Sequence, residues 1–118
     1  RGKMFLVTDA MPPVGADDPH FLLNGQPITA IDGICRTADG VLAGSALDMA
    51  TALRNSVQQV GLPLEEAARM ASTYPADFLA LGHSHGRIAA GYRADFVVID
   101  DAMQVCETWI GGAPSGND

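Results

Sequence analysis

An aspartate at the end of an apolar segment is the first candidate for chemistry in this 118-residue chain. Residues 4–7 are all apolar, Asp9 follows them, and two prolines come shortly afterwards. Such a run predicts a strand buried on both faces, and in parallel sheets ligands gather at the carboxyl ends of the strands. Asp9 is then a carboxylate that can exchange protons with a metal-bound water and a leaving group. The alternative is an Asp that only caps a turn, and these residues alone favour it.

The second candidate is the segment formed by Leu42, Ala43, Gly44 and Ser45, where a ligand can approach the chain. Small residues let a ligand approach the backbone, and the free N–H groups at the start of a following helix can donate hydrogen bonds to it. A plain turn from a strand into a helix explains the same residues equally well.

The histidines and cysteines do not form a convincing metal site. His83 and His85 are two residues apart in a polar loop, and His20 follows an acidic turn, so surface positions are favoured for all of them. Cys35 and Cys106 have no metal-type spacing and are expected to be buried thiols, with a disulfide or a metal pair as the less favoured alternative. We therefore assign no metal ligand in this chain. It also contains no Gly-rich phosphate loop and no GxSxG motif.

A β-rich segment separates the two candidates. Residues 21–29 predict a hairpin, because Asn24 and Gly25 suit the positive φ angles of a tight turn. Pro27 restricts the second arm of that hairpin to an edge strand. Residues 31–36 and 41–43 predict another short ribbon.

Helices and then further strands follow the second candidate. Ser45 is expected to cap a helix whose apolar stripe runs to Val60 and which Gly61 ends. Pro63 starts a second helix, and residues 75–81 form a short third one. Strands are predicted at 87–89, 96–99 and 104–110, and residues 111–118 are expected to be a flexible tail.

Composition excludes several classes of protein. Hydrophobic residues make up 47% of the chain, which argues against disorder. The formal net charge of −7 argues against nucleic acid as a partner.

No apolar run approaches the roughly 20 residues of a membrane span, and no signal pattern is visible, so a cytoplasmic location without membrane contact is expected. The chain is far shorter than the roughly 250 residues of a complete (β/α)8 barrel, and its abrupt start indicates a piece of a longer protein.

Several motifs together resemble one family. The segments LVTDA (6–10), GVLAGS (40–45), ASTYPAD (71–77) and GRIAAGYRADFV (86–97) are similar to the carboxyl-terminal third of the N-acetylglucosamine-6-phosphate deacetylases, within the amidohydrolase superfamily. The last segment indicates only the superfamily, whereas the others are more specific. The resemblance covers nearly the whole chain.

The resemblance implies an α/β fold and a mechanism. The chain would supply the last strand and helices of a metal-dependent (β/α)8 hydrolase barrel in residues 1–82, strands of a small β-sandwich in 83–111, and a tail in 112–118. Asp9 would be the catalytic acid/base, and Leu42, Ala43 and Gly44 would lie against the substrate near its acetyl group. The divalent metal, zinc or similar, would be held by a Glu and two His upstream of this chain.

The substrate implied is N-acetylglucosamine 6-phosphate, an amino-sugar phosphate, hydrolysed to glucosamine 6-phosphate and acetate. The complete enzyme is expected to be a homo-oligomer, and the isolated chain to be inactive. Two alternatives remain. One is a fragment of another amidohydrolase, similar to dihydroorotase or adenine deaminase. The other is a non-catalytic assembly module, which the unpaired first strand disfavours.

Overall fold

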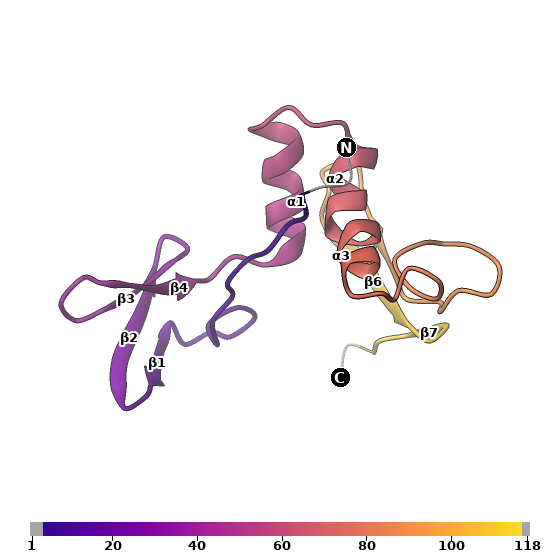
Figure 1. Ribbon diagram of the computed structural model, residues 1–118. Helices are drawn as coiled ribbons and strands as arrows, with labels where there is room; N and C mark the ends of the chain where they lie inside the picture. Colours follow the sequence, from indigo (N-terminus) through magenta and orange to yellow (C-terminus); the bar gives the residue numbers. More distant parts are fainter. Residues whose placement is uncertain (1–3, 117–118) are drawn as a thin grey trace. The chain divides into compact units, whose positions relative to one another are not determined.

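The chain is a mixed α/β structure, as expected. The computed structural model describes residues 4–116, which contain helices and two antiparallel sheets (Figure 1). The chain divides into two compact units. One unit is formed by residues 7–52, and the other by the chain before and after that segment.

The unit of residues 7–52 is built on a four-stranded antiparallel sheet with the strands in sequence order (Figure 1). Ile28 and Cys35 are fully buried and form the centre of its small core. The strands are β1 (His20–Leu23), β2 (Gln26–Ile31), β3 (Ile34–Thr37) and β4 (Leu42–Ser45).

Two-residue turns connect the first three strands, and the sequence predicted the first of them, at Asn24 and Gly25. Asn24 and Gly25 have φ values of 51° and 79°, and Asp32 and Gly33 have 50° and 78°. These left-handed pairs match the twist of an antiparallel hairpin. Each turn residue is a type that tolerates positive φ.

The expectation that β2 is an edge strand is wrong, because β2 lies between β1 and β3. Pro27 pairs with Leu22 of β1, whereas the pairing of β2 with β3 begins only at Ile28. The missing N–H of Pro27 therefore does not interrupt the ladder between β2 and β3.

The strand predicted for residues 4–7 is also wrong, since these residues form no strand in the structure. A strand requires a hydrogen-bonded neighbour, and the apolar run has no such ladder among residues 4–116. Instead, the Leu6 N–H donates to the Met70 carbonyl at 3.0 Å. The ring of Phe5 packs against Phe78 with the centroids 5.3 Å apart.

Helix α1 (Met49–Gln58) begins later than predicted, and Asp48 rather than Ser45 caps it. The Thr51 N–H donates to Asp48 Oδ1 at 2.8 Å, and the Thr51 hydroxyl donates to Oδ2 at 2.6 Å. These bonds hold the pKa of Asp48 below its usual value. Ser45 is left for another contact, because it belongs to β4.

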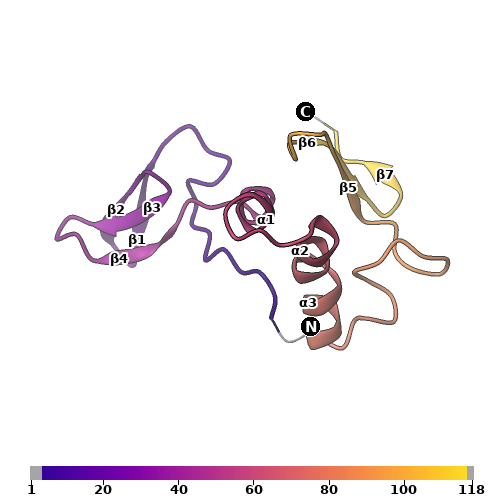
Figure 2. The same cartoon turned by 90° about the horizontal axis from the view of Figure 1, so that it is seen from above.

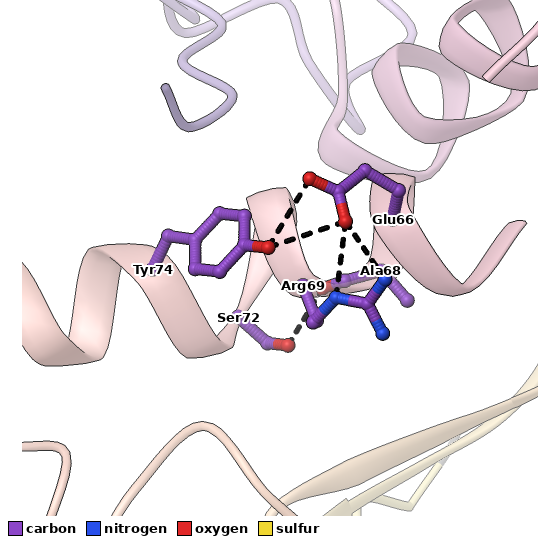
Figure 3. Close-up of polar contacts among 5 residues, drawn as sticks. All are labelled: Glu66, Ala68, Arg69, Ser72 and Tyr74. Atoms are coloured by element: carbon purple, nitrogen blue, oxygen red, sulfur yellow. Dashed lines mark hydrogen bonds and ion pairs between the residues drawn. The ribbon is translucent and has the colours of Figure 1, made fainter. Parts of the chain in front are cut away.

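Helices α2 (Leu64–Ala71) and α3 (Thr73–Phe78) are joined by a polar cluster (Figure 3). The half-buried Glu66 carboxylate accepts hydrogen bonds from the Arg69 guanidinium at 2.7 Å and from the Tyr74 hydroxyl at 3.1 Å. The third helix starts two residues earlier than predicted. Pro75 is tolerated there because the first turn of a helix has no intrahelical acceptors for its N–H groups.

A three-stranded antiparallel sheet follows the helices (Figure 2). Phe96 and Trp109 stack across neighbouring strands with their centroids 5.5 Å apart. The strand predicted at 87–89 is absent. The segment predicted to be a tail contains a two-residue strand. Its last two residues, 117–118, lie outside the described part of the chain. The strands are β5 (Phe96–Ile99), β6 (Val105–Ile110) and β7 (Ala113–Pro114).

Asp95, from the superfamily motif, has a structural role beside this sheet. Its carboxylate pairs with Arg93 at 2.6 Å and accepts the Gly111 N–H at 2.7 Å. Arg93 first, and the Gly111 N–H second, lower the pKa of Asp95. The motif thus connects the segment before β5 to the turn between β6 and β7.

Candidate active site

The structure brings the two sequence-predicted site segments together within the unit of residues 7–52. Ala10 forms a parallel bridge with Ser45 at the end of β4. The Ser45 N–H donates to the Asp9 carbonyl at 2.9 Å, and the Met11 N–H donates to the Ser45 carbonyl at 2.8 Å. The backbone of Asp9 is therefore fixed against the strand that contains Leu42, Ala43 and Gly44.

Asp9 is exposed, and its backbone has a φ of 52°. This left-handed conformation is uncommon for a residue with a side chain, although Asp tolerates it better than most. Such conformations persist when the surrounding structure enforces them, and they are concentrated at functional sites. The carboxylate of Asp9 is thus available to solvent, while its main chain is constrained.

Gly44 is buried and has a φ of 117°, so a side chain there would be strained whatever the space around it. A Cβ atom would also lie 2.5 Å from Met11 Cγ and 3.2 Å from the Asp9 carbonyl oxygen. Met11 fills the space that a side chain at position 44 would need. Glycine is therefore required here so that β4 can approach the segment containing Asp9 and Met11.

Leu42 and Ala43 differ from Gly44 in their exposure. The side chain of Leu42 is 65% exposed, and Ala43 is half-buried. These two residues are therefore the part of the predicted substrate-binding segment that a ligand can reach directly.

The thiol of Cys35 is influenced by the charge of Asp9. Burial, and secondly the negative charge of Asp9, raise the pKa of its thiol. Cys35 is therefore a neutral, buried group at physiological pH. Cys106 is exposed, so the expectation that both cysteines are buried is wrong for that residue, and both thiols are free.

The histidines lie apart from Asp9 in the sequence and have other neighbours. His20 is in β1, with its Nδ1 atom 3.1 Å from the Thr29 hydroxyl. His85 has its Nδ1 atom 2.8 Å from the Ser84 hydroxyl, and His83 is exposed. Within residues 4–116, no group of three His, Cys, Asp or Glu side chains is arranged to hold a metal ion. The described residues therefore do not fit a resident metal.

Ser45 and Met11 contribute to the site in ways that sequence reasoning missed. The sequence favours a helix cap for Ser45, and nothing in it singles out Met11. The separation of 34 positions between them gives no local periodicity that would connect them. The small residues at 43–45 did indicate a close approach, but the sequence analysis assigned that approach to a ligand and not to another segment of the chain.

Comparison with known protein families identifies the class of protein. The profile of the amidohydrolase family matches residues 4–117, so this chain belongs to the amidohydrolase family. No described helix is long and apolar enough to cross a membrane.

Particular relatives are sugar-phosphate deacetylases. The chain is 38% identical over 112 residues to N-acetylgalactosamine-6-phosphate deacetylase of Escherichia coli O157:H7, covering 95% of this chain and 30% of the relative. It is also 38% identical to human N-acetylglucosamine-6-phosphate deacetylase, covering 92% of this chain and 27% of that protein. The chain thus spans about a third or less of the length of these relatives.

Solved structures show the same similarity. The crystal structure of N-acetylglucosamine-6-phosphate deacetylase from Pasteurella multocida superposes with a TM-score of 0.92 at 34% identity, covering 98% of this chain and 31% of that one. The corresponding enzyme from Thermotoga maritima gives a TM-score of 0.84 at 34% identity, covering 96% and 31% of the two chains.

Proposed function

We propose that this chain is the carboxyl-terminal part of an amidohydrolase that removes the acetyl group from N-acetylglucosamine 6-phosphate. In this proposal it contributes the end of a (β/α)8 barrel and strands of a small β-sandwich. The observation that carries the proposal is the attachment of the Asp9 backbone to Ser45 of β4, which holds an exposed Asp against the strand that contains the predicted substrate segment. The similarity to deacetylases supports the choice of substrate.

Asp9 acts in this proposal as the acid/base of an amide hydrolysis. Its carboxylate accepts a proton from the water molecule whose oxygen attacks the acetamide carbonyl carbon. As the C–N bond breaks, the same group delivers the proton to the departing amine, so that acetate and glucosamine 6-phosphate result. Leu42, Ala43 and Gly44 lie against the acetyl end of the substrate.

The family generally uses a divalent metal ion. Since no described cluster fits such an ion, its ligands in this proposal come from outside residues 4–116. The contribution of this chain is therefore proton transfer and substrate positioning. We further propose that the complete enzyme is a cytoplasmic homo-oligomer.

A second substrate is supported by a specific observation. The relatives from Escherichia coli O157:H7 and a Shewanella strain, at 38% and 39% identity, are N-acetylgalactosamine-6-phosphate deacetylases. The two sugars differ only in the configuration at C4, which is remote from the amide that Asp9 serves. The proposed chemistry is the same for both.

Acetate release, measured with added zinc from both N-acetylated sugar phosphates, tests the proposal. The full-length protein that carries this chain and the 118-residue chain should be assayed side by side. We expect turnover only by the full-length protein, and the ratio of kcat/KM values identifies the preferred sugar. Absence of turnover of either sugar by the full-length protein would reject the deacetylase proposal, and turnover by the short chain would reject the expectation that it is inactive.

A further inference from the structure

Ser45 forms hydrogen bonds with the chain on both sides of Asp9. Its hydroxyl donates to the Thr8 carbonyl, and its N–H donates to the Asp9 carbonyl at 2.9 Å. Its own carbonyl accepts the Met11 N–H at 2.8 Å. The hydroxyl also accepts the Leu47 N–H at 3.1 Å, so its position is itself constrained.

These bonds fix the backbone angles of Asp9. The Thr8 carbonyl belongs to the peptide plane before Asp9, and the Asp9 carbonyl belongs to the plane after it. When both planes are held by the same residue, neither φ nor ψ of Asp9 can rotate freely. The direction of the Asp9 Cα–Cβ bond, and hence the origin of its carboxylate, follows from those angles.

The left-handed conformation of Asp9 must be stabilised by surrounding contacts. A φ of 52° is unfavourable for a residue with a Cβ atom, so Asp9 would relax toward negative φ without restraint. The Ser45 hydroxyl is not needed to cap α1, because Asp48 performs that function. The Thr8 carbonyl is part of no described strand, and the Ser45 hydroxyl supplies it with a donor.

We propose that Ser45 is a positioning residue that holds Asp9 in its left-handed conformation and so aims the carboxylate at the reacting amide. This inference rests on the proposed function, because it assumes that Asp9 transfers the proton. Ser45 itself touches no reacting atom in this scheme. Its hydroxyl acts through the peptide plane that precedes Asp9.

Ser45→Ala in the full-length protein tests this proposal, because it removes the hydroxyl while keeping the backbone bonds. We expect kcat to fall about 10- to 100-fold with KM nearly unchanged, as for a small misplacement of a catalytic group. Ser45→Thr keeps the hydroxyl and should restore most of kcat. Ser72→Ala is the matched control, since its hydroxyl also donates to a backbone carbonyl, that of Ala68 at 2.7 Å, and Ser72 belongs to the other unit of the chain.

A double-mutant cycle separates positioning from general damage. In the Asp9→Asn background, Ser45→Ala should produce little further loss of kcat, because no acid/base remains to be aimed.

Hydrogen exchange provides a readout that does not depend on activity. The Ser45→Ala variant should exchange faster than the parent in a peptide covering residues 8–11, and Ser45→Thr should not.

Each failure has a distinct meaning. Full activity of Ser45→Ala together with inactive Asp9→Asn would overturn the positioning role and leave the proposed function standing. If Ser45→Ala lowered kcat by the same factor in the parent and in the Asp9→Asn variant, the loss would be a general structural defect. That result would also overturn the positioning role. Near-normal turnover by Asp9→Asn would overturn the catalytic assignment of Asp9 and this inference with it.

Discussion

At the scale of single residues, Asp9 combines a constrained main chain with exposure to solvent. The main chain is hydrogen-bonded to β4 and adopts a left-handed conformation, whereas the residue as a whole is exposed. A proton-transfer group benefits from both properties, since it must meet substrate and yet keep its direction. Two predictions belong to this scale.

Asp9→Asn keeps the shape of the side chain but removes its capacity to accept and return a proton. In the full-length protein we expect kcat to fall about 10²- to 10⁴-fold with little change in KM. Steady-state kinetics of acetate release measures both constants. A loss confined to KM would assign Asp9 to substrate binding instead.

Gly44→Ala should destabilise the unit of residues 7–52 by about 1–3 kcal/mol, because alanine at positive φ is strained and its Cβ would collide with Met11. Gly15→Ala is the matched control: its φ is 78°, but nothing lies within 4 Å of the added carbon. Chemical denaturation compares the two free energies of unfolding. An equal effect of both substitutions would show that the contact with Met11 is unimportant.

At the scale of elements, short polar contacts decide where helices begin and how they join. Asp48 sets the start of α1 through Thr51, and Glu66 connects α2 to α3 through Tyr74. Both contacts involve a carboxylate that accepts hydrogen bonds, so each should respond to loss of charge or of the donor.

The Asp48 cap should weaken in acid. Its pKa is lowered in the folded chain, so its contribution to stability is present above the unfolded pKa of 3.8 and is lost as pH falls through the folded value. Asp48→Ala should cost about 1 kcal/mol near neutral pH. The difference between parent and variant, followed by circular dichroism against pH, should shrink below about pH 4. If the difference in stability between the parent and Asp48→Ala stayed constant with pH, the charge of Asp48 would not be what stabilises the start of α1.

Tyr74→Phe tests the junction between α2 and α3. It removes the hydroxyl that donates to Glu66 and leaves the ring in place, so a loss of about 1.5 kcal/mol is expected for a bond to a charged group. Thermal unfolding of the full-length protein measures this loss. An unchanged melting temperature would mean that the Tyr74 hydroxyl does not contribute to the stability of this junction.

At the scale of the whole molecule, large apolar side chains remain uncovered. Met4 is 72% exposed and Phe78 is 74% exposed, although Phe5 packs on the ring of Phe78. We expect the isolated chain to associate or exchange segments, since exposed apolar surface favours contact with another copy. Light scattering over a concentration series measures this. A monomer at all concentrations, with one cooperative unfolding transition, would contradict the expectation.

The sequence alone determined the features that local chemistry controls. The hairpin turn at Asn24 and Gly25 was predictable because few residue types accept positive φ. The start of α2 after Pro63 was predictable for a similar reason. Asp9 and residues 42–44 were singled out by their types and flanking patterns.

Tertiary structure decided what depends on a partner distant in the sequence. Residues 4–7 have the pattern of a strand but lack a ladder among the described residues, so apolar pattern alone did not make them one. Ser45 has the chemistry of a helix cap, yet the approach of residues 8–11 gave its hydroxyl another acceptor. Gly44 became obligatory because its φ is 117° and because Met11 packs against it. Side-chain type limits which contacts are possible, and the path of the distant chain selects among them.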